Sequence, residues 1–109
     1  MAYPQGAIVI AEDPFGNAPK RPYLVLSNDQ VPFYGQEYIA AVVTTTARPE
    51  AIELTANRFE AGHLPRRSYV SPWSVLTLKD WMITKHPAQL TDATVDDARQ
   101  ETETYLQTG

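Results

Sequence analysis

Several features are scarce in this chain of 109 residues, and cysteine is absent altogether. Without cysteine there are no disulfides, no thiolate zinc sites and no cysteine nucleophile. No stretch reaches the ~18 apolar residues that a membrane-spanning helix needs. Residues 1–5 lack the basic start and the apolar segment of a signal peptide. We therefore expect a cytoplasmic protein with no membrane partner.

The familiar catalytic motifs are missing as well. The sequence has no glycine-rich phosphate loop, no Gly-x-Ser-x-Gly elbow and no His-Glu-x-x-His pair. Its histidines, His63 and His86, are residue types that serve as acid and base in a metal-free ribonuclease, although both read as exposed loop residues. Neither has a second histidine or a carboxylate at ligand spacing, so we expect no metal site.

Positive charge is also in short supply, since the net charge is −4. Residues 91–109 carry five acidic side chains and one basic one, which accounts for the whole net charge. Residues 1–90 are balanced, with eight side chains of each sign. A sequence-blind nucleic-acid binder is normally more basic, but a local basic surface is compatible with this balance. Lys20-Arg21 and Arg66-Arg67 are the densest basic pairs.

What the chain does contain is a series of short apolar segments separated by nine prolines and five glycines. The length and the 43% hydrophobic content fit one domain over residues 1–109. Turn-forming residues predict a loop over residues 13–19. The pattern predicts about six strands, over residues 6–11, 22–27, 38–45, 51–55, 68–71 and 74–78. The connections are too short for parallel crossovers, so we expect a mostly β, small barrel.

The C-terminal segment has a different periodicity. Val95, Ala98, Thr102 and Tyr105 recur at spacings of three and four residues, which is typical of one helix face. Thr91 has the right side chain and position to cap the N-terminus of this helix. The sequence therefore predicts a C-terminal α-helix that carries the net negative charge.

Arg21 is the first candidate for chemistry. The following Pro22 restricts Arg21 to extended geometry at a loop-to-strand junction. The planar guanidinium matches the geometry of phosphate oxygens. A solvated arginine at the start of a strand is the alternative interpretation of the same residue.

The threonines that end the strand over residues 38–45 form the second candidate. Side chains alternate along a strand, so Thr44 and Thr46 face one way and Thr45 the other. A hydroxyl at a strand end is able to donate to a phosphate, although threonine also favours strands for its β propensity alone. Trp73 and Trp81 are interpreted first as core or interface residues, with base-stacking platforms as the alternative.

The order of these segments resembles the PemK/MazF family of toxin-antitoxin endoribonuclease toxins. The resemblance rests on residues 6–9, on Lys20-Arg21-Pro22 with the apolar strand ending in Ser27-Asn28-Asp29, and on residues 39–46. Residues 53–58, 68–70, 75–78 and 90–106 occupy the places of the family's later elements. The resemblance implies an SH3-like barrel of the CcdB/PemK type, with a C-terminal helix, that forms a homodimer. It also implies a cofactor-free, metal-independent endoribonuclease that cleaves single-stranded RNA, inhibits translation and growth, and is neutralised by a cognate antitoxin.

Carried over by position, the resemblance assigns the catalytic roles to Arg21 and Thr44. Without a metal, the attacking group is the substrate's own 2′-OH, and Arg21 and Thr44 stabilise charge on the phosphate. A further set of basic and hydroxyl side chains is expected to bind RNA: Lys20, Thr46, Arg66, Arg67 and Thr77.

Some positions depart from the family pattern. Gly6-Ala7 stands where relatives have Gly-Asp, and residues 15–19 differ from the usual loop before the arginine. Ser74 and Leu76 replace a glutamine and an arginine that help to bind RNA. These departures keep open a catalytically degenerate barrel that binds protein or RNA. An unrelated structural β-barrel is the third alternative.

Overall fold

The computed structural model describes residues 2–14, 16 and 19–108. Its strands are β1 (Ala7–Glu12), β2 (Lys20–Val25), β3 (Glu37–Thr44), β4 (Ile52–Glu53), β5 (Phe59–Gly62), β6 (Tyr69–Lys79) and β7 (Ile83–Leu90). Two single 3₁₀ turns lie over Ala56–Arg58 and Asp80–Met82, and the C-terminal helix α1 spans Asp92–Leu106. Within the loop predicted over residues 13–19, positions 15, 17 and 18 lie outside the described residues.

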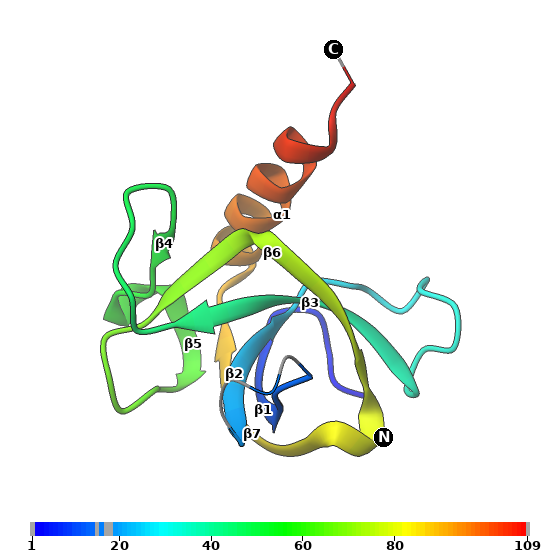
Figure 1. Ribbon diagram of the computed structural model, residues 1–109. Helices are drawn as coiled ribbons and strands as arrows, with labels where there is room; N and C mark the ends of the chain where they lie inside the picture. The colour runs from blue at the N-terminus through cyan, green and yellow to red at the C-terminus, as the bar shows by residue number, and fades with distance from the viewer. Residues whose placement is uncertain (1, 15, 17–18, 109) are drawn as a thin grey trace.

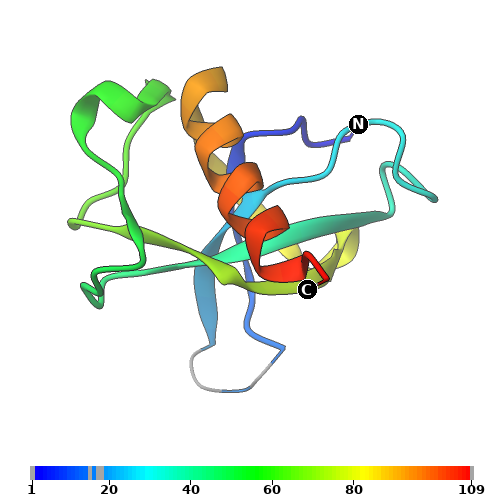
Figure 2. The ribbon, with the colours of Figure 1, turned by 90° about the horizontal axis from the view of Figure 1, so that it is seen from above.

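All the strands belong to one antiparallel sheet, in the order β4-β6-β3-β2-β1-β7-β5. The sheet curls strongly into a half-barrel, and α1 crosses the outside of β6 (Figures 1 and 2). The predicted mostly β, SH3-like barrel with a C-terminal helix is therefore confirmed. Among the described residues, no helix combines the length and the apolar character needed to cross a membrane.

The segments predicted as two strands around Pro72 form the single long strand β6. Its pairing with β3 shifts at this point, because Val42 lies opposite Ser71 whereas Ala41 lies opposite Val75. Residues 72–74 therefore form a bulge. A proline fits a bulge because it has no N–H to offer to the ladder.

Strands β5 and β7 were not predicted. Their sequences contain little apolar alternation, and β7 includes Pro87, which argues against a strand in a sequence interpretation. The structure accommodates Pro87 where the register between β1 and β7 shifts: Ile8 pairs with Ala88, but Ile10 pairs with Lys85. Thus both proline-containing strands that the prediction split or missed carry an irregularity beside the proline.

Two apolar clusters lie on the two faces of the sheet. The inner cluster includes Ala7, Val9, Ala11, Tyr23, Val25, Tyr38, Ala40 and Val42. The second cluster joins Ile8, Leu24, Val43, Val70 and Leu90 to Val95 and Ala98 of α1. The Thr91 side chain accepts a hydrogen bond from the Thr94 N–H, which confirms the predicted cap. Trp73 and Trp81 are 42% and 74% exposed, so neither belongs to the core, and their interpretation as interface residues stays a prediction.

Candidate functional site

The inward faces of three neighbouring strands turn from apolar to polar at the same end of the sheet. The last apolar residues of these faces are Ala11 of β1, Tyr23 of β2 and Val42 of β3. Asp13, Arg21 and Thr44 lie two residues beyond them toward this end of the sheet. They share the inward face because alternate side chains of a strand point the same way. Arg21 precedes Tyr23 in the chain, since β2 runs antiparallel to β1 and β3. The register pairs Ala11 with Arg21 and Tyr23 with Val42. Extending it brings Arg21 opposite Thr44.

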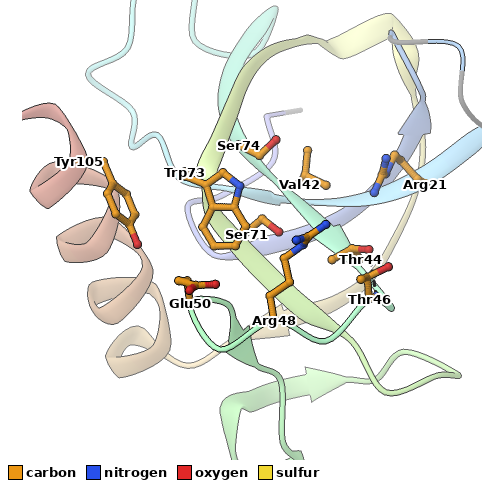
Figure 3. Close-up of a pocket in the computed structure, with 10 residues that line it drawn as sticks. All are labelled: Arg21, Val42, Thr44, Thr46, Arg48, Glu50, Ser71, Trp73, Ser74 and Tyr105. Atoms are coloured by element: carbon orange, nitrogen blue, oxygen red, sulfur yellow. Dashed lines mark hydrogen bonds between the residues drawn. The ribbon is translucent and has the colours of Figure 1, made fainter.

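Arg21 and Thr44 line two depressions that adjoin at these residues. The larger has a volume of about 640 Å³ and is lined by Arg21, Val42, Thr44, Thr46, Arg48, Glu50, Ser71, Trp73, Ser74 and Tyr105 (Figure 3). The smaller, of about 390 Å³, adds Lys20, Pro22, Val43, Thr45, Arg66 and Ser68. We call the two depressions together the groove. Its floor is Arg21, Thr44 and Ser71, and its rim is Arg48, Glu50, Trp73 and Tyr105.

Arg21 is held from below by an acidic partner. Its Nη1 atom lies 4.0 Å from Oδ2 of Asp13, and the Asp13 side chain is fully buried, whereas that of Arg21 is 24% exposed. The Nε–H of Arg21 is buried and has no hydrogen-bond acceptor among the described residues. A buried donor without a partner is uncommon in native proteins.

Thr44 presents a hydroxyl of fixed orientation beside Arg21. Its Oγ1 atom accepts a hydrogen bond of 3.1 Å from the backbone N–H of Thr46. This bond uses a lone pair of the hydroxyl oxygen, so the hydroxyl proton remains available as a donor. The neighbouring floor residue, Ser71, is buried and adds a second hydroxyl. The floor thus combines a guanidinium with hydroxyl donors.

A buried tyrosine lies beneath the floor. Burial, followed by the negative charge of Asp13, raises the pKa of Tyr23 to about 12, against a smaller opposing effect of Arg21. Tyr23 is fully buried and therefore keeps its proton through the whole physiological range. The result is a neutral hydroxyl packed beside the Asp13 carboxylate.

The rim comes from three segments that are distant in the sequence. Arg48 and Glu50 lie in the loop after β3, Trp73 and Ser74 in the bulge of β6, and Tyr105 in the last turn of α1. In Figure 3 the Arg48 side chain extends from its loop into the pocket. Thr102 donates a hydrogen bond of 2.7 Å to the Pro72 carbonyl oxygen, which fastens α1 to the bulge.

Sequence reasoning missed Arg48, Glu50 and Tyr105 as site residues. Each lies in an exposed segment, and only the folded chain brings them to one pocket. A usable signal existed for Arg48, since it follows the threonine-rich end of β3 by two residues. No comparable signal marks Tyr105, which belongs to the predicted helical stripe.

The structure brings most of the predicted residues to the groove. Lys20, Thr46 and Arg66 line it with Arg21 and Thr44. Two do not: Arg67 pairs with Glu53 at 3.6 Å, and Thr77 lies exposed on β6 opposite Ile39.

Both histidines also lie away from the groove. His63 borders a separate depression, and the ring of His86 stands edge-on to that of Tyr3, with the ring centroids 5.6 Å apart. Over residues 2–14, 16 and 19–108, no group of three His, Cys, Asp or Glu side chains has an arrangement suited to a metal ion. The groove's own chemistry is therefore that of cations, hydroxyls and aromatic rings.

Its charges suit an anionic ligand. In the part of the chain that the structure describes, Lys20, Arg48 and Arg66 form no ion pair, and Glu50 is the acidic residue lining the groove. Three cations without acidic partners around a guanidinium and hydroxyls form a surface suited to consecutive phosphates. Exposed Trp73 and Tyr105 offer aromatic faces on which bases are able to stack.

Comparison with known proteins gives a consistent fold. No protein-family model matches the chain, and no curated protein matches it significantly. Among solved structures, a MazE–MazF crystal form from Deinococcus radiodurans aligns with a TM-score of 0.74 and 20% identity, covering 100% of this chain and 99% of that one.

Two mycobacterial structures align similarly. One is described as an endoribonuclease in complex with its cognate antitoxin (TM-score 0.73, 19% identity, 96% of this chain and 93% of that one). The other is the Mycobacterium tuberculosis toxin MazF-mt6 (TM-score 0.69, 21% identity, 94% and 99%). The chain therefore has the fold of MazF-type toxins.

Proposed function

We propose that this chain is the toxin of a toxin-antitoxin system and a metal-independent endoribonuclease that cleaves single-stranded RNA. The observation that carries the proposal is the position of Arg21 and Thr44, which lie on adjoining strand ends and line both depressions of the groove. The likeness to solved MazF structures adds support through the shared fold. Its cellular consequence is inhibition of translation and growth.

The reaction begins with the RNA 2′-OH. Its oxygen attacks the adjacent phosphorus, loses its proton to solvent or to a basic group, and displaces the 5′-oxygen of the next nucleotide, which gains a proton. The products are a 2′,3′-cyclic phosphate, or the 3′-phosphate after hydrolysis, and a 5′-OH. Arg21 stabilises the charge that develops on the phosphoryl oxygens, and Thr44 donates to a non-bridging oxygen.

The rest of the groove holds the flanking nucleotides. Lys20 and Arg66 lie on one side of the Arg21–Thr44 pair and Arg48 on the other, which suits phosphates before and after the cleaved bond. Trp73 and Tyr105 provide stacking surfaces for unpaired bases. A duplex keeps its bases stacked and its 2′-OH out of line, so we expect a preference for single strands. Arg67 and Thr77, outside the groove, are retained as contacts for a longer RNA.

We propose further that two copies associate through an exposed apolar face beside the groove. This face consists of Ile39, Val75 and Leu106, which are between 40% and 75% exposed. Large apolar side chains exposed on one face often mark interaction sites. Sedimentation velocity of wild type and of Val75→Lys measures this: a wild-type monomer, or an unchanged dimer in the variant, argues against the face.

A cognate antitoxin is the other proposed partner. Two of the similar structures are described as containing an antitoxin or MazE. An antitoxin that covers the groove prevents RNA from reaching Arg21. The neighbouring gene provides the reagent: its product is expected to suppress both growth inhibition and RNA cleavage when both proteins are made together.

The direct test is cleavage in EDTA of a long single-stranded RNA and of its DNA counterpart. Wild type is expected to cut the RNA and leave the DNA intact. Arg21→Ala is expected to lose about 10²- to 10³-fold in rate, the cost of removing one preorganised charge-stabilising donor. Arg99→Ala is the matched control, because Arg99 lies on α1 among acidic side chains and outside the groove. No RNA cleavage by wild type, or equal cleavage by Arg21→Ala, would rule the proposal out.

One observation keeps a second function in view. Leu76 packs against the inner apolar cluster, and so offers no RNA contact where relatives have an arginine. A degenerate barrel that only binds protein or RNA predicts growth inhibition that survives in the Arg21→Ala, Thr44→Ala double variant. The unpaired Arg48 guanidinium in the groove favours the catalytic proposal, since it restores a second arginine to the site.

A further inference from the structure

Asp13 is a buried carboxylate directly beneath the groove floor. It follows the inward-facing residues Ala7, Val9 and Ala11 of β1, and its side chain is fully buried. An ionised carboxylate in such a place is costly unless it has a cation and hydrogen-bond donors around it. Arg21 supplies the cation at 4.0 Å. The hydroxyl of Tyr23 lies near the carboxylate and stays neutral, because burial and then the charge of Asp13 raise its pKa to about 12.

The two partners are placed by elements that leave little freedom. The ladder between β1 and β2 pairs Ala11 with Arg21, which places Asp13 two residues past the position paired with Arg21. Pro22 fixes the backbone that follows Arg21. The ladder fixes the Cα position of Arg21, and its Nη1 atom lies toward Asp13. The other Nη group of the guanidinium is then left for the groove.

From this geometry we infer that Asp13 is the positioning residue of the site: its buried carboxylate holds the Arg21 guanidinium in the orientation that meets the reacting phosphate. This inference rests on the proposed ribonuclease function. Asp13 touches no substrate and acts only through Arg21. Orientation matters at this level because a displacement of about 1 Å in a reacting group costs about 10²-fold in rate.

Positioning has a kinetic signature that general damage to the fold lacks. The Asp13 carboxylate offsets part of the charge of Arg21, so removing it leaves the groove more positive. Substrate attraction is then kept or strengthened while the alignment of the guanidinium is lost. We therefore expect Asp13→Asn to lower kcat about 10- to 100-fold with KM unchanged or lower.

The experiment measures kcat and KM on a short RNA that contains one wild-type cleavage site. Asp29→Asn is the matched control, since it makes the same chemical change on the exposed loop between β2 and β3 and is expected to leave both constants unchanged. Thermal unfolding and an active-site titration establish that equal amounts of folded, binding-competent protein are compared. Should Asp13→Asn fail to fold, Asp13→Glu, which keeps the charge but displaces it by one methylene, is expected to lower kcat several-fold at constant KM.

A double-mutant cycle decides whether the effect passes through Arg21. In an Arg21→Lys background with measurable activity, Asp13→Asn is expected to cost less than about twofold, because coupled residues are non-additive. Any of three results overturns the inference: full additivity of the two substitutions, an unchanged kcat in Asp13→Asn, or a rise in KM that accounts for the whole loss. In each case, cleavage of RNA by the wild type still supports the proposed function. Absence of wild-type RNA cleavage in EDTA overturns both.

Discussion

The floor and the rim of the groove are built in opposite ways. The floor residues Arg21, Thr44 and Ser71 lie on β2, β3 and β6, where the strand registers fix their backbones. The rim residues come from a loop, a bulge and the end of a helix, and all are exposed. Precise chemistry is easier to hold on strands, whereas loops tolerate change and adapt to different ligands. Under the proposed ribonuclease function, this difference would assign catalysis to the floor and RNA selection to the rim.

The two groove arginines show the contrast most clearly. Arg21 is 24% exposed and is paired with a buried carboxylate. Arg48 is exposed, lies in the loop after β3 and forms no ion pair with a described residue. In the proposed function, the first guanidinium is oriented before RNA arrives and the second adapts to the phosphate backbone.

The largest effect expected from this comparison comes from exchanging arginine for lysine at each position. At Arg21 the planar fork is needed, so Arg21→Lys is expected to lower kcat about 100-fold, near the low end of the loss of a preorganised donor. At Arg48 a point charge suffices, so Arg48→Lys is expected to change kcat/KM by less than about threefold. Steady-state cleavage of one short RNA by both variants measures this. Equal losses at the two sites would break the distinction between floor and rim.

A smaller effect is expected from the two threonines that face the groove. Thr44→Val keeps the shape but removes the hydroxyl, and is expected to lower kcat about 10- to 100-fold, the value of a hydrogen bond to a charged group. Thr46→Val is the control, because the Thr46 backbone N–H donates to Thr44 and survives the change. A larger loss in Thr46→Val than in Thr44→Val contradicts the assignment of Thr44 to the floor.

The smallest effect concerns stability at high pH. Burial raises the pKa of Tyr23 and of Tyr38 from 10.0 to about 12. Below about pH 10 both tyrosines are protonated in the folded and unfolded chains, so their contribution is complete. Between about pH 10 and pH 12 the unfolded chain loses these protons before the folded chain does, so the free energy of unfolding declines over this range.

Urea unfolding at a series of pH values measures this loss. Tyr23→Phe, beneath the floor, and Tyr38→Phe, which removes a donor to Asp80, are each expected to flatten the alkaline decline relative to wild type. If the free energy of unfolding falls as steeply with pH in both variants as in wild type, folding does not raise the pKa of either tyrosine.

The sequence predicted the floor better than the rim. Arg21 and Thr44 were assigned through the family resemblance, and both stand at strand ends whose apolar patterns are visible in the sequence. The third floor residue, Ser71, was not predicted as a site residue. Arg48, Glu50 and Tyr105 meet at the rim only because the β3–β4 loop, the bulge and α1 converge there. Nothing local in the sequence encodes that convergence.

The errors in the fold share a cause. Pro72 and Pro87 read as strand breakers, but each sits at an irregular point of an antiparallel ladder, where the missing N–H is tolerated. The same bulge places Trp73, which was expected in the core or in an interface, on the rim of the groove. The first strand was predicted from Gly6, but β1 begins at Ala7 and Gly6 lies in the turn before it. Its φ of +91° and the close approach of Gln89 and Val95 to an added Cβ explain why only glycine fits there.

The central claim is that the floor aligns one phosphate for attack by its neighbouring 2′-OH, and a single 2′-deoxy substitution tests it most directly. The substrate is a short RNA spanning a mapped cleavage site, with the 2′-OH removed from the nucleotide on the 5′ side of the cleaved bond. The account predicts that wild type leaves this bond intact in EDTA, while the same RNA with the substitution moved to a distant nucleotide is cut normally. Continued cleavage at the modified bond would contradict it.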